Sequence, residues 1–177
     1  MKANPNIHTL NISSCNHLTD ITCAGMLNVP HLNKLTHLDM SYCYNITSPM
    51  LAAVVSKCPL LKRFAVRYCH NLQDDLLDAL SNHCPLLEIF DAPNCRHFSD
   101  LAICNMAAKC THIAQIDFCG LDKMGDIAVI ALSTYCIQLQ LLIISSCPQL
   151  SDAAYKSLAK CKYLQRLCIS NSLTLSK

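Results

Sequence analysis

The sequence has no tryptophan, only three glycines and few charged residues, which occupy 15% of its 177 positions. So few glycines argue against phosphate-binding loops and against folds that need many tight turns. Fourteen Lys and Arg residues nearly balance twelve Asp and Glu residues, which leaves no strong field to hold nucleic acid or an anionic membrane. We therefore expect neither a nucleic acid nor a membrane as partner.

Long apolar runs and a secretory leader are also missing. The longest apolar stretches, such as residues 127–132, are far shorter than the roughly 18 residues that a transmembrane helix needs. Residues 1–6 contain no apolar segment of the kind found in signal peptides. These features predict an intracellular protein, cytoplasmic or nuclear, whose thiols stay reduced and act as small hydrophobic side chains.

Cysteine, by contrast, is abundant, and ten of the 14 cysteines form two periodic series. The first series repeats every 26 residues, with a final step of 25, and comprises Cys58, Cys84, Cys110, Cys136 and Cys161. The second series trails the first by 11 residues and comprises Cys15, Cys43, Cys69, Cys95 and Cys147. We expect all ten of these thiols to be reduced and buried.

The apolar residues follow the same period. Residues 58–74 and 84–100 share the frame C-P-x-L-x-x-L-x-h-x-x-C-x-x-L-[ST]-D, in which h is small or apolar. Seven copies of this frame begin near residues 4, 32, 58, 84, 110, 136 and 161, and the last copy is truncated. The pattern predicts one domain of about seven repeats over residues 1–177.

Each copy predicts a short strand, a loop and a helix. Apolar residues two apart, such as Leu38 and Met40, indicate strand alternation over a short span. Apolar residues three apart, such as Ile103 and Met106, place one face of the following helix toward the core. Hydroxyl side chains that can cap the free amides of these helices are Thr19, Thr47, Ser99 and Ser151. Aspartates that follow at the first helical position, where a carboxylate favours the positive helix end, are Asp20, Asp100 and Asp152.

A unit of this size cannot bury its own apolar face, so stacked copies must share one continuous core. We therefore predict an α/β fold, a right-handed horseshoe solenoid. Its parallel sheet lines the concave face, and its helices line the convex face.

The frame resembles the cysteine-containing subtype of leucine-rich repeat, over residues 4–175. This subtype is familiar from F-box/leucine-rich-repeat proteins, in which an F-box docks onto the Skp–cullin ubiquitin ligase and the repeats hold the substrate. The frame also resembles the repeats of mitotic-exit antagonist proteins, which lack an F-box of the usual kind. The resemblance implies a protein-interaction scaffold, principally for substrate recognition by an SCF-type ubiquitin ligase. Because the repeats begin near Met1, association with Skp and cullin requires an F-box outside this chain.

Two other functions stay open. Some plant members of the family hold hormones or inositol phosphates in the solenoid, which suggests a small-ligand receptor. A polyphosphate pocket needs several convergent Lys or Arg residues, however, and the inner wall offers only Arg63, Arg67 and Arg166. The other alternative is a leucine-rich-repeat adaptor unrelated to ubiquitin.

Motifs for catalysis and metal binding are missing. The sequence has no C-x-x-C pair, no H-E-x-x-H, no Walker loop and no G-x-S-x-G. We expect a protein that is not an enzyme and that holds no cofactor and no metal.

The strand positions that point away from the core predict a contiguous wall on the concave face, because neighbouring strands lie ~4.8 Å apart. The candidate partner-binding residues on this wall are His37, Asp39, Tyr42, Arg63, Arg67, Tyr68, Asp91, Gln115 and Asp117. Tyr and Arg are favoured as interface anchors. The competing interpretation is that Arg63 and Arg67 merely pair with Asp39 and Asp91 across strands, which contributes only about 0–1 kcal/mol for exposed pairs.

Overall fold

The computed structural model describes residues 6–171, so the first five and last six residues of the expected domain lie outside it. Seven three-residue strands form one parallel sheet in chain order. They are β1 (Thr9–Asn11), β2 (His37–Asp39), β3 (Arg63–Ala65), β4 (Ile89–Asp91), β5 (Gln115–Asp117), β6 (Leu141–Ile143) and β7 (Arg166–Cys168). Whether the chain forms a single domain over residues 1–177 stays a prediction.

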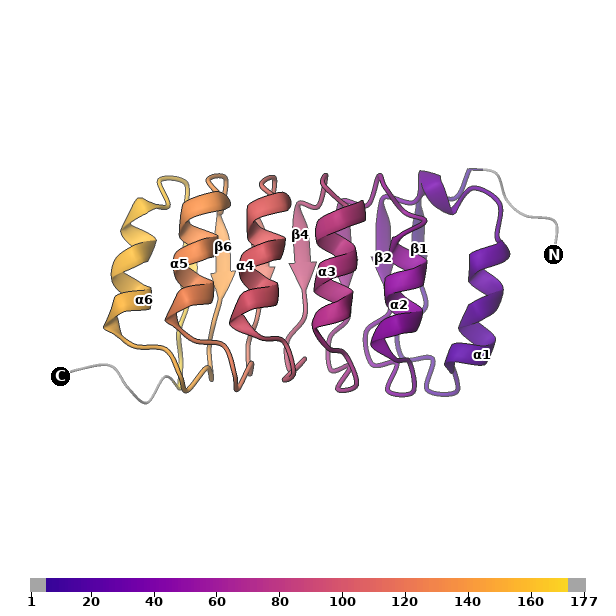
Figure 1. The fold of residues 1–177 in the computed structure, drawn as a ribbon, viewed down its shortest axis with the longest axis horizontal. Coiled ribbons are helices and arrows are strands. Elements are labelled where there is room, and N and C mark those ends of the chain that lie inside the picture. Colours follow the sequence, from indigo (N-terminus) through magenta and orange to yellow (C-terminus); the bar gives the residue numbers. More distant parts are fainter. Residues whose placement is uncertain (1–5, 172–177) are drawn as a thin grey trace.

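Helices connect the strands and form a second layer. They are α1 (Asp20–Cys23), α2 (Ser48–Val55), α3 (Asp74–His83), α4 (Asp100–Lys109), α5 (Asp126–Tyr135) and α6 (Asp152–Ser157). Short 3₁₀ turns add η1 (Ala24–Asn28), η2 (Leu32–Lys34) and η3 (Leu158–Lys160). Figure 1 shows the helices side by side in chain order, with the strands behind them. None of the helices in residues 6–171 has the length and apolar character needed to cross a bilayer.

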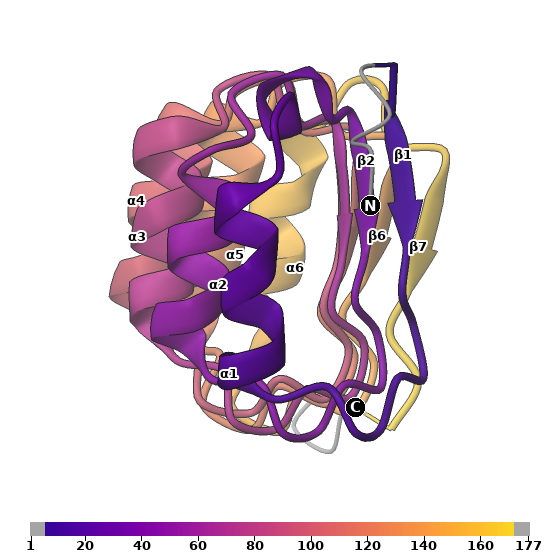
Figure 2. The same cartoon turned by 90° about the vertical axis from the view of Figure 1, so that its right-hand side faces the viewer.

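The two layers bend into an arc. In Figure 2 the central helices α3 and α4 lie farther out on the helical side than α1 and α6 do, so the strands line the concave side. The predicted α/β solenoid, with its sheet on the concave face and its helices on the convex face, is confirmed.

The core lies between the layers and is continuous from repeat to repeat. The middle residue of each central strand points inward, and Phe64 and Phe90 are fully buried there. Their rings stack with centroids 6.0 Å apart, and Phe118 meets Phe90 edge-on at 5.7 Å. From the helical side, Ile103 and Met106 are fully buried, as their spacing predicts.

The two cysteine series form columns inside this core, and nine of their ten thiols are buried. The four buried members of the second series can each donate the thiol hydrogen to a carbonyl in the preceding repeat. Cys95 donates to the Val66 carbonyl at 3.2 Å, and Cys147 donates to the Phe118 carbonyl at 3.3 Å. A small, apolar side chain with one weak donor fits this position, because it fills the space and still satisfies a buried carbonyl.

Cys15 contradicts the prediction, because its side chain is exposed. Cys15 belongs to the first repeat, and the described part of the chain has no earlier repeat to cover it. The sequence period identifies the column but says nothing about which member lies at an open end.

Burial keeps the interior thiols protonated. Desolvation raises the pKa of Cys58 and Cys110 to about 11. It raises the pKa of Cys84 and Cys136 to about 12, with a smaller contribution from neighbouring thiols. The thiolate is the form that attacks electrophiles and binds metals, so these four buried thiols are poorly reactive at neutral pH.

The helix starts show a second periodic contact, which the sequence only partly predicted. Ser99 caps α4, because its hydroxyl accepts a hydrogen bond from the Ala102 amide at 3.3 Å. Thr47 precedes α2 but makes no such cap, so that prediction is wrong. The Thr47 hydroxyl instead donates to the Asp20 carboxylate of the preceding repeat at 2.6 Å. The first-turn aspartates therefore join repeats as well as favouring the positive ends of their own helices.

Candidate functional site

Strand register arranges the predicted site residues in two rows on the concave face. His37, Arg63 and Gln115 share the first strand position, and Arg63 lies directly beside His37. Asp39, Asp91 and Asp117 share the third position, and Asp91 lies beside Asp117. The middle residue of each strand points into the core, so both rows face the concave side.

Arg63 and Arg67 converge on Asp91. The Arg63 guanidinium lies 2.9 Å from Asp91 Oδ2, and the Arg67 guanidinium lies 3.2 Å from the same oxygen. The Asp91 side chain is only 10% exposed, whereas the two arginine side chains are 44% and 41% exposed. The carboxylate thus lies beneath two half-exposed cations. The competing interpretation, in which these arginines pair with Asp39 and Asp91 across strands, holds for Asp91, which both arginines contact.

The backbone explains why Asp91 is available. In the equivalent positions, Asp39 Oδ1 accepts a hydrogen bond from the Ser41 amide at 2.9 Å, and Asp117 Oδ1 accepts one from the Cys119 amide at 3.0 Å. Two residues after Asp91 comes Pro93, which has no amide hydrogen to donate. Asp91 therefore lacks the local turn contact and directs its carboxylate to the two arginines instead.

Charge around Arg67 is nearly balanced. Burial lowers the pKa of Arg67, but the carboxylates of Asp91 and Asp117 outweigh that effect and raise it. Burial raises the pKa of Asp117, although Arg67 and the Cys119 amide act in the opposite direction. Two cations, Arg63 and Arg67, thus lie near two carboxylates, Asp91 and Asp117. This balance suits recognition of mixed polar groups better than capture of a highly charged ligand.

Tyr42 and Tyr68 stack beside this cluster. Their ring centroids lie 5.2 Å apart with an interplanar angle of 13°. Both residues have left-handed backbone conformations, with φ of 62° and 60°. A left-handed backbone costs roughly 1–2 kcal/mol for a residue other than glycine, and it is rare for a bulky one. Large aromatic rings thus occupy positions where glycine or asparagine would fold at lower cost, which points to a use for the rings.

In every repeat the residue before the second cysteine position has a left-handed backbone. The residues in this column, here called the left-handed column, are Ser14, Tyr42, Tyr68, Asn94, Gly120, Ser146 and Asn171. At Gly120 a Cβ atom would lie 2.7 Å from Asn94 Oδ1, so any other residue would require the Asn94 side chain to shift.

Tyr44 and His70 extend the aromatic group, and the sequence interpretation missed them. Their rings stack 6.2 Å apart, and the His70 ring meets Tyr68 edge-on at 6.3 Å. Both follow the second cysteine of their repeats, Cys43 and Cys69. This repeated position after the second cysteine, two residues from each tyrosine of the stacked pair, could have predicted that Tyr44 and His70 lie beside that pair.

Not all nine predicted residues join the central cluster. The structure brings together Tyr42, Arg63, Arg67, Tyr68 and Asp91, and places Asp117 within electrostatic reach of Arg67. The name central cluster is used below for Tyr42, Arg63, Arg67, Tyr68 and Asp91, without Asp117. His37 binds the Thr36 hydroxyl, Asp39 binds its own turn, and Gln115 lies one strand beyond Ile89.

Hollows in the surface are shallow. A depression of about 200 Å³ over β1 and β2 is lined by His37, Asp39 and Arg63 among others. A larger one of about 370 Å³ lies where α2 and α3 begin, and it has no Lys or Arg in its lining. Small-molecule pockets usually measure about 300–1,000 Å³ and enclose their ligand, and a polyphosphate would need several cations. Within residues 6–171 no group of three His, Cys, Asp or Glu side chains is placed to hold a metal ion.

Comparison of structures identifies the architecture. A chain in the crystal structure of the yeast Rad7–Elc1 complex superposes with a TM-score of 0.65 and 15% sequence identity, over 92% of this chain and 56% of that one. An internalin from Listeria monocytogenes, InlF, superposes with a TM-score of 0.58 and 14% identity, over 98% of this chain and 57% of that one. The fold is a leucine-rich-repeat solenoid.

These likenesses concern the fold alone, since both identities are low. The leucine-rich-repeat chain described here spans just over half the length of each of the two proteins. No protein-family model matches the sequence, and no curated protein matches it.

Proposed function

We propose that this solenoid is a protein-interaction scaffold whose concave face binds a partner protein at the central cluster. One observation carries the proposal: the buried Asp91 carboxylate holds Arg63 and Arg67 half-exposed beside a strained tyrosine stack. Arg and Tyr are the residue types that most often supply binding energy in protein interfaces.

Preorganisation supports the proposal. Ordering a flexible side chain on binding costs about 0.5–1.5 kcal/mol. Asp91 fixes both guanidinium groups before a partner arrives, and stacking fixes both tyrosine rings. Each guanidinium carries five N–H donors, so donors remain for a partner after Asp91 is bound.

Within this function we propose substrate recognition for an SCF-type ubiquitin ligase. The support is the cysteine-containing repeat frame, together with the likeness of the fold to a chain that was crystallised in complex with a second protein. Skp and cullin would then join through an F-box outside these residues. The proposal places the protein in the cytoplasm or nucleus and gives it no catalytic step and no cofactor. A leucine-rich-repeat adaptor unrelated to ubiquitin is the competing outcome.

The test is co-purification from an extract of the cells that express the protein. The variant Arg63→Gln/Arg67→Gln removes both cations without reversing charge beside Asp91. Arg166→Gln is the matched control, because Arg166 occupies the same strand position as Arg63 but lies on β7, far along the sheet. We expect the double variant to lose a protein partner that the parent and the control both retain.

The identity of the retained proteins separates the finer proposals. Recovery of Skp and cullin with an Arg-dependent partner supports the ligase role. An Arg-dependent partner without ubiquitin components supports the adaptor. Equal recovery of every partner by all three proteins would show that the central cluster is not the binding site.

A further inference from the structure

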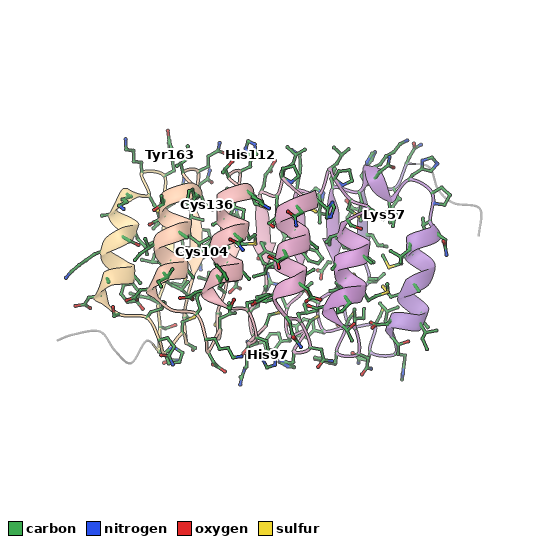
Figure 3. The ribbon with its side chains drawn as sticks, in the orientation of Figure 1. Lys57, His97, Cys104, His112, Cys136 and Tyr163 are labelled. Carbon is green, nitrogen blue, oxygen red and sulfur yellow. The ribbon has the colours of Figure 1, made fainter. Side chains whose placement is uncertain are left out.

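Four apolar side chains form a contiguous patch on the convex face. Leu101 is the second residue of α4 and is 72% exposed, and Ile127 is the second residue of α5 and is 66% exposed. One turn farther along, Cys104 is partly buried and Ile130 is 38% exposed. Because α4 and α5 pack side by side, these residues form a two-by-two array, here called the convex patch. Figure 3 labels Cys104 on this helical side of the molecule.

Acidic residues border the convex patch on one side. The equivalent positions of α3 carry Asp75 and Asp78, each 26 residues before its counterpart in α4, and both are exposed. The four ion pairs found in residues 6–171 leave both aspartates unused. Two rows of equivalent positions therefore run across α3, α4 and α5. The first row is Asp75, Leu101 and Ile127, and the second row is Asp78, Cys104 and Ile130.

The opposite border carries the other sign of charge. The equivalent positions of α6 are Ala153 and Lys156, and both are exposed. Near the C-terminal ends of α3 and α4, Lys109 Nζ donates to Asn82 Oδ1 at 2.6 Å, so polar groups border the patch there as well. The convex patch is thus apolar in the middle, acidic over α3 and basic over α6.

The fold itself does not require apolar residues here. Single exposed leucines and isoleucines are common on protein surfaces and need no explanation. In α3, however, the same two helical positions hold aspartate without disturbing the buried Leu76, Leu77 and Leu80. Cys104 packs partly against the core, but the apolar residues Leu101, Ile127 and Ile130 are free of packing demands and fall in two adjacent repeats.

The spacing of the array matches one face of an α-helix. Neighbouring packed helices lie about 8–10 Å apart. Residues seven apart on a helix share a face and are about 10.5 Å apart. A partner helix lying across α4 and α5 can therefore place apolar residues i and i+7 on Leu101 and Ile127. The residue at i−7 then lies over Asp75 and Asp78.

We propose that the convex patch binds an amphipathic helix of a partner protein, with Lys or Arg at the end that lies over α3. Apolar contact supplies the affinity, and the carboxylates of Asp75 and Asp78 set the direction of the helix. This surface lies on the opposite layer from the central cluster, so it does not depend on the concave face being used (Figure 2).

Synthetic helices test the proposal with the whole chain. Three fluorescein-labelled peptides of about 21 residues, three heptads, are compared by fluorescence anisotropy. The first has two leucines seven residues apart and a pair of lysines seven residues before them. The second replaces the lysines with glutamates, and the third contains the residues of the first in scrambled order. We expect saturable binding of the first, about 10-fold weaker binding of the second at low salt, and none of the third.

Variants locate the binding. Leu101→Gln/Ile127→Gln should lose the first peptide, while Ile21→Gln should retain it. Ile21 is the matched control, because it is the second residue of α1 and is 88% exposed but lies away from the convex patch. Asp75→Lys/Asp78→Lys should reverse the preference in favour of the glutamate peptide. All of these side chains are exposed, so each variant should unfold within about 0.5 kcal/mol of the parent.

Several results would overturn the proposal. They are no saturable binding of any peptide, equal loss in Ile21→Gln, unchanged binding in Leu101→Gln/Ile127→Gln, or no reversal in the lysine variant.

Discussion

Asp74 in α3 holds Ser99 of the next repeat through both carboxylate oxygens. Asp74 Oδ1 accepts the Ser99 amide at 2.8 Å, and Oδ2 accepts the Ser99 hydroxyl at 2.6 Å. Asp20 makes the same pair of contacts with Thr47, and Asp126 makes it with Ser151. A carboxylate bridge of this kind fixes where each helix begins relative to the one before it.

Loss of this bridge should destabilise the array. We expect Asp74→Ala to lower the free energy of unfolding by about 1–3 kcal/mol, because it leaves the Ser99 amide and hydroxyl without their charged acceptor. The matched control is Asp78→Ala in the same helix, which is exposed and should change stability by less than about 0.5 kcal/mol. Urea titration measures both, and equal effects would mean that the bridge contributes nothing.

Gly125 offers the opposite experiment. Its amide donates to Asp100 Oδ1 at 2.7 Å, but glycine has no hydroxyl for the second oxygen. We expect Gly125→Ser to restore the second hydrogen bond and to raise stability by about 0.5–1.5 kcal/mol. A new Cβ atom would lie 2.9 Å from Asp100 Oδ2, so that carboxylate must shift slightly.

The control for this substitution is Gly125→Ala, which adds the same Cβ atom without the hydroxyl. Thermal unfolding should rank serine above alanine. Serine and alanine variants of equal stability would contradict the hydrogen-bonding explanation.

Burial of Leu87 should make it costly to replace. Leu87 is fully buried, and its neighbour Leu86 is 37% exposed. We expect Leu87→Ala to lower the free energy of unfolding by about 2–5 kcal/mol, because it leaves a cavity in a core that several repeats share. Leu86→Ala, the matched control, should cost far less. An unchanged urea midpoint for Leu87→Ala would mean that this residue lies outside the core.

Alkaline pH should unfold the protein through its thiols. Burial raises the pKa of Cys84 from 9.0 to about 12, so the folded state keeps a proton that the unfolded state releases above pH 9. This stability is fully present below pH 9 and is lost as pH rises through the folded-state pKa. Each such thiol removes up to about 1.4 kcal/mol per pH unit.

Urea midpoints measured from pH 7 to pH 11 check this expectation. Cys84→Ala should lower stability at pH 7 but make its decline above pH 9 less steep. Cys15→Ala, which changes an exposed thiol, serves as the control. A slope that is the same in all three proteins would assign the alkaline loss to other groups.

The period in the sequence was sufficient to predict the strands, the helices and their order. It repeats the packing of Phe64 and Phe90 at a fixed interval, and copies of a unit too small to bury its own apolar face must stack on one another. The period could not predict that Cys15 lies exposed, because exposure depends on what precedes a repeat. Nor did it predict the role of Thr47, since a hydroxyl can serve its own helix or a neighbouring carboxylate with equal ease.

The sequence predicted which residues of the candidate site lie on the concave side, but it did not predict which of them contact one another. Strand alternation placed Arg63, Arg67 and Asp91 on the concave side. The choice of Asp91 by both arginines depends on the missing amide hydrogen of Pro93, a detail of one turn. The left-handed conformation of Tyr42 was hidden as well, because tyrosine gives no signal for it and only the glycine and asparagines of the same column do.

The left-handed column also bears on how readily this protein could be given a new target. Its positions already accept serine, tyrosine, asparagine and glycine within one chain, while the buried residues around them stay nearly constant. Residues with side chains as different as serine and tyrosine meet the backbone demand at six of the seven positions, and Gly120 is the exception. A combinatorial library that varies this column, together with the outward strand positions beside it, would diversify the concave face at a fixed spacing and leave every interior contact in place.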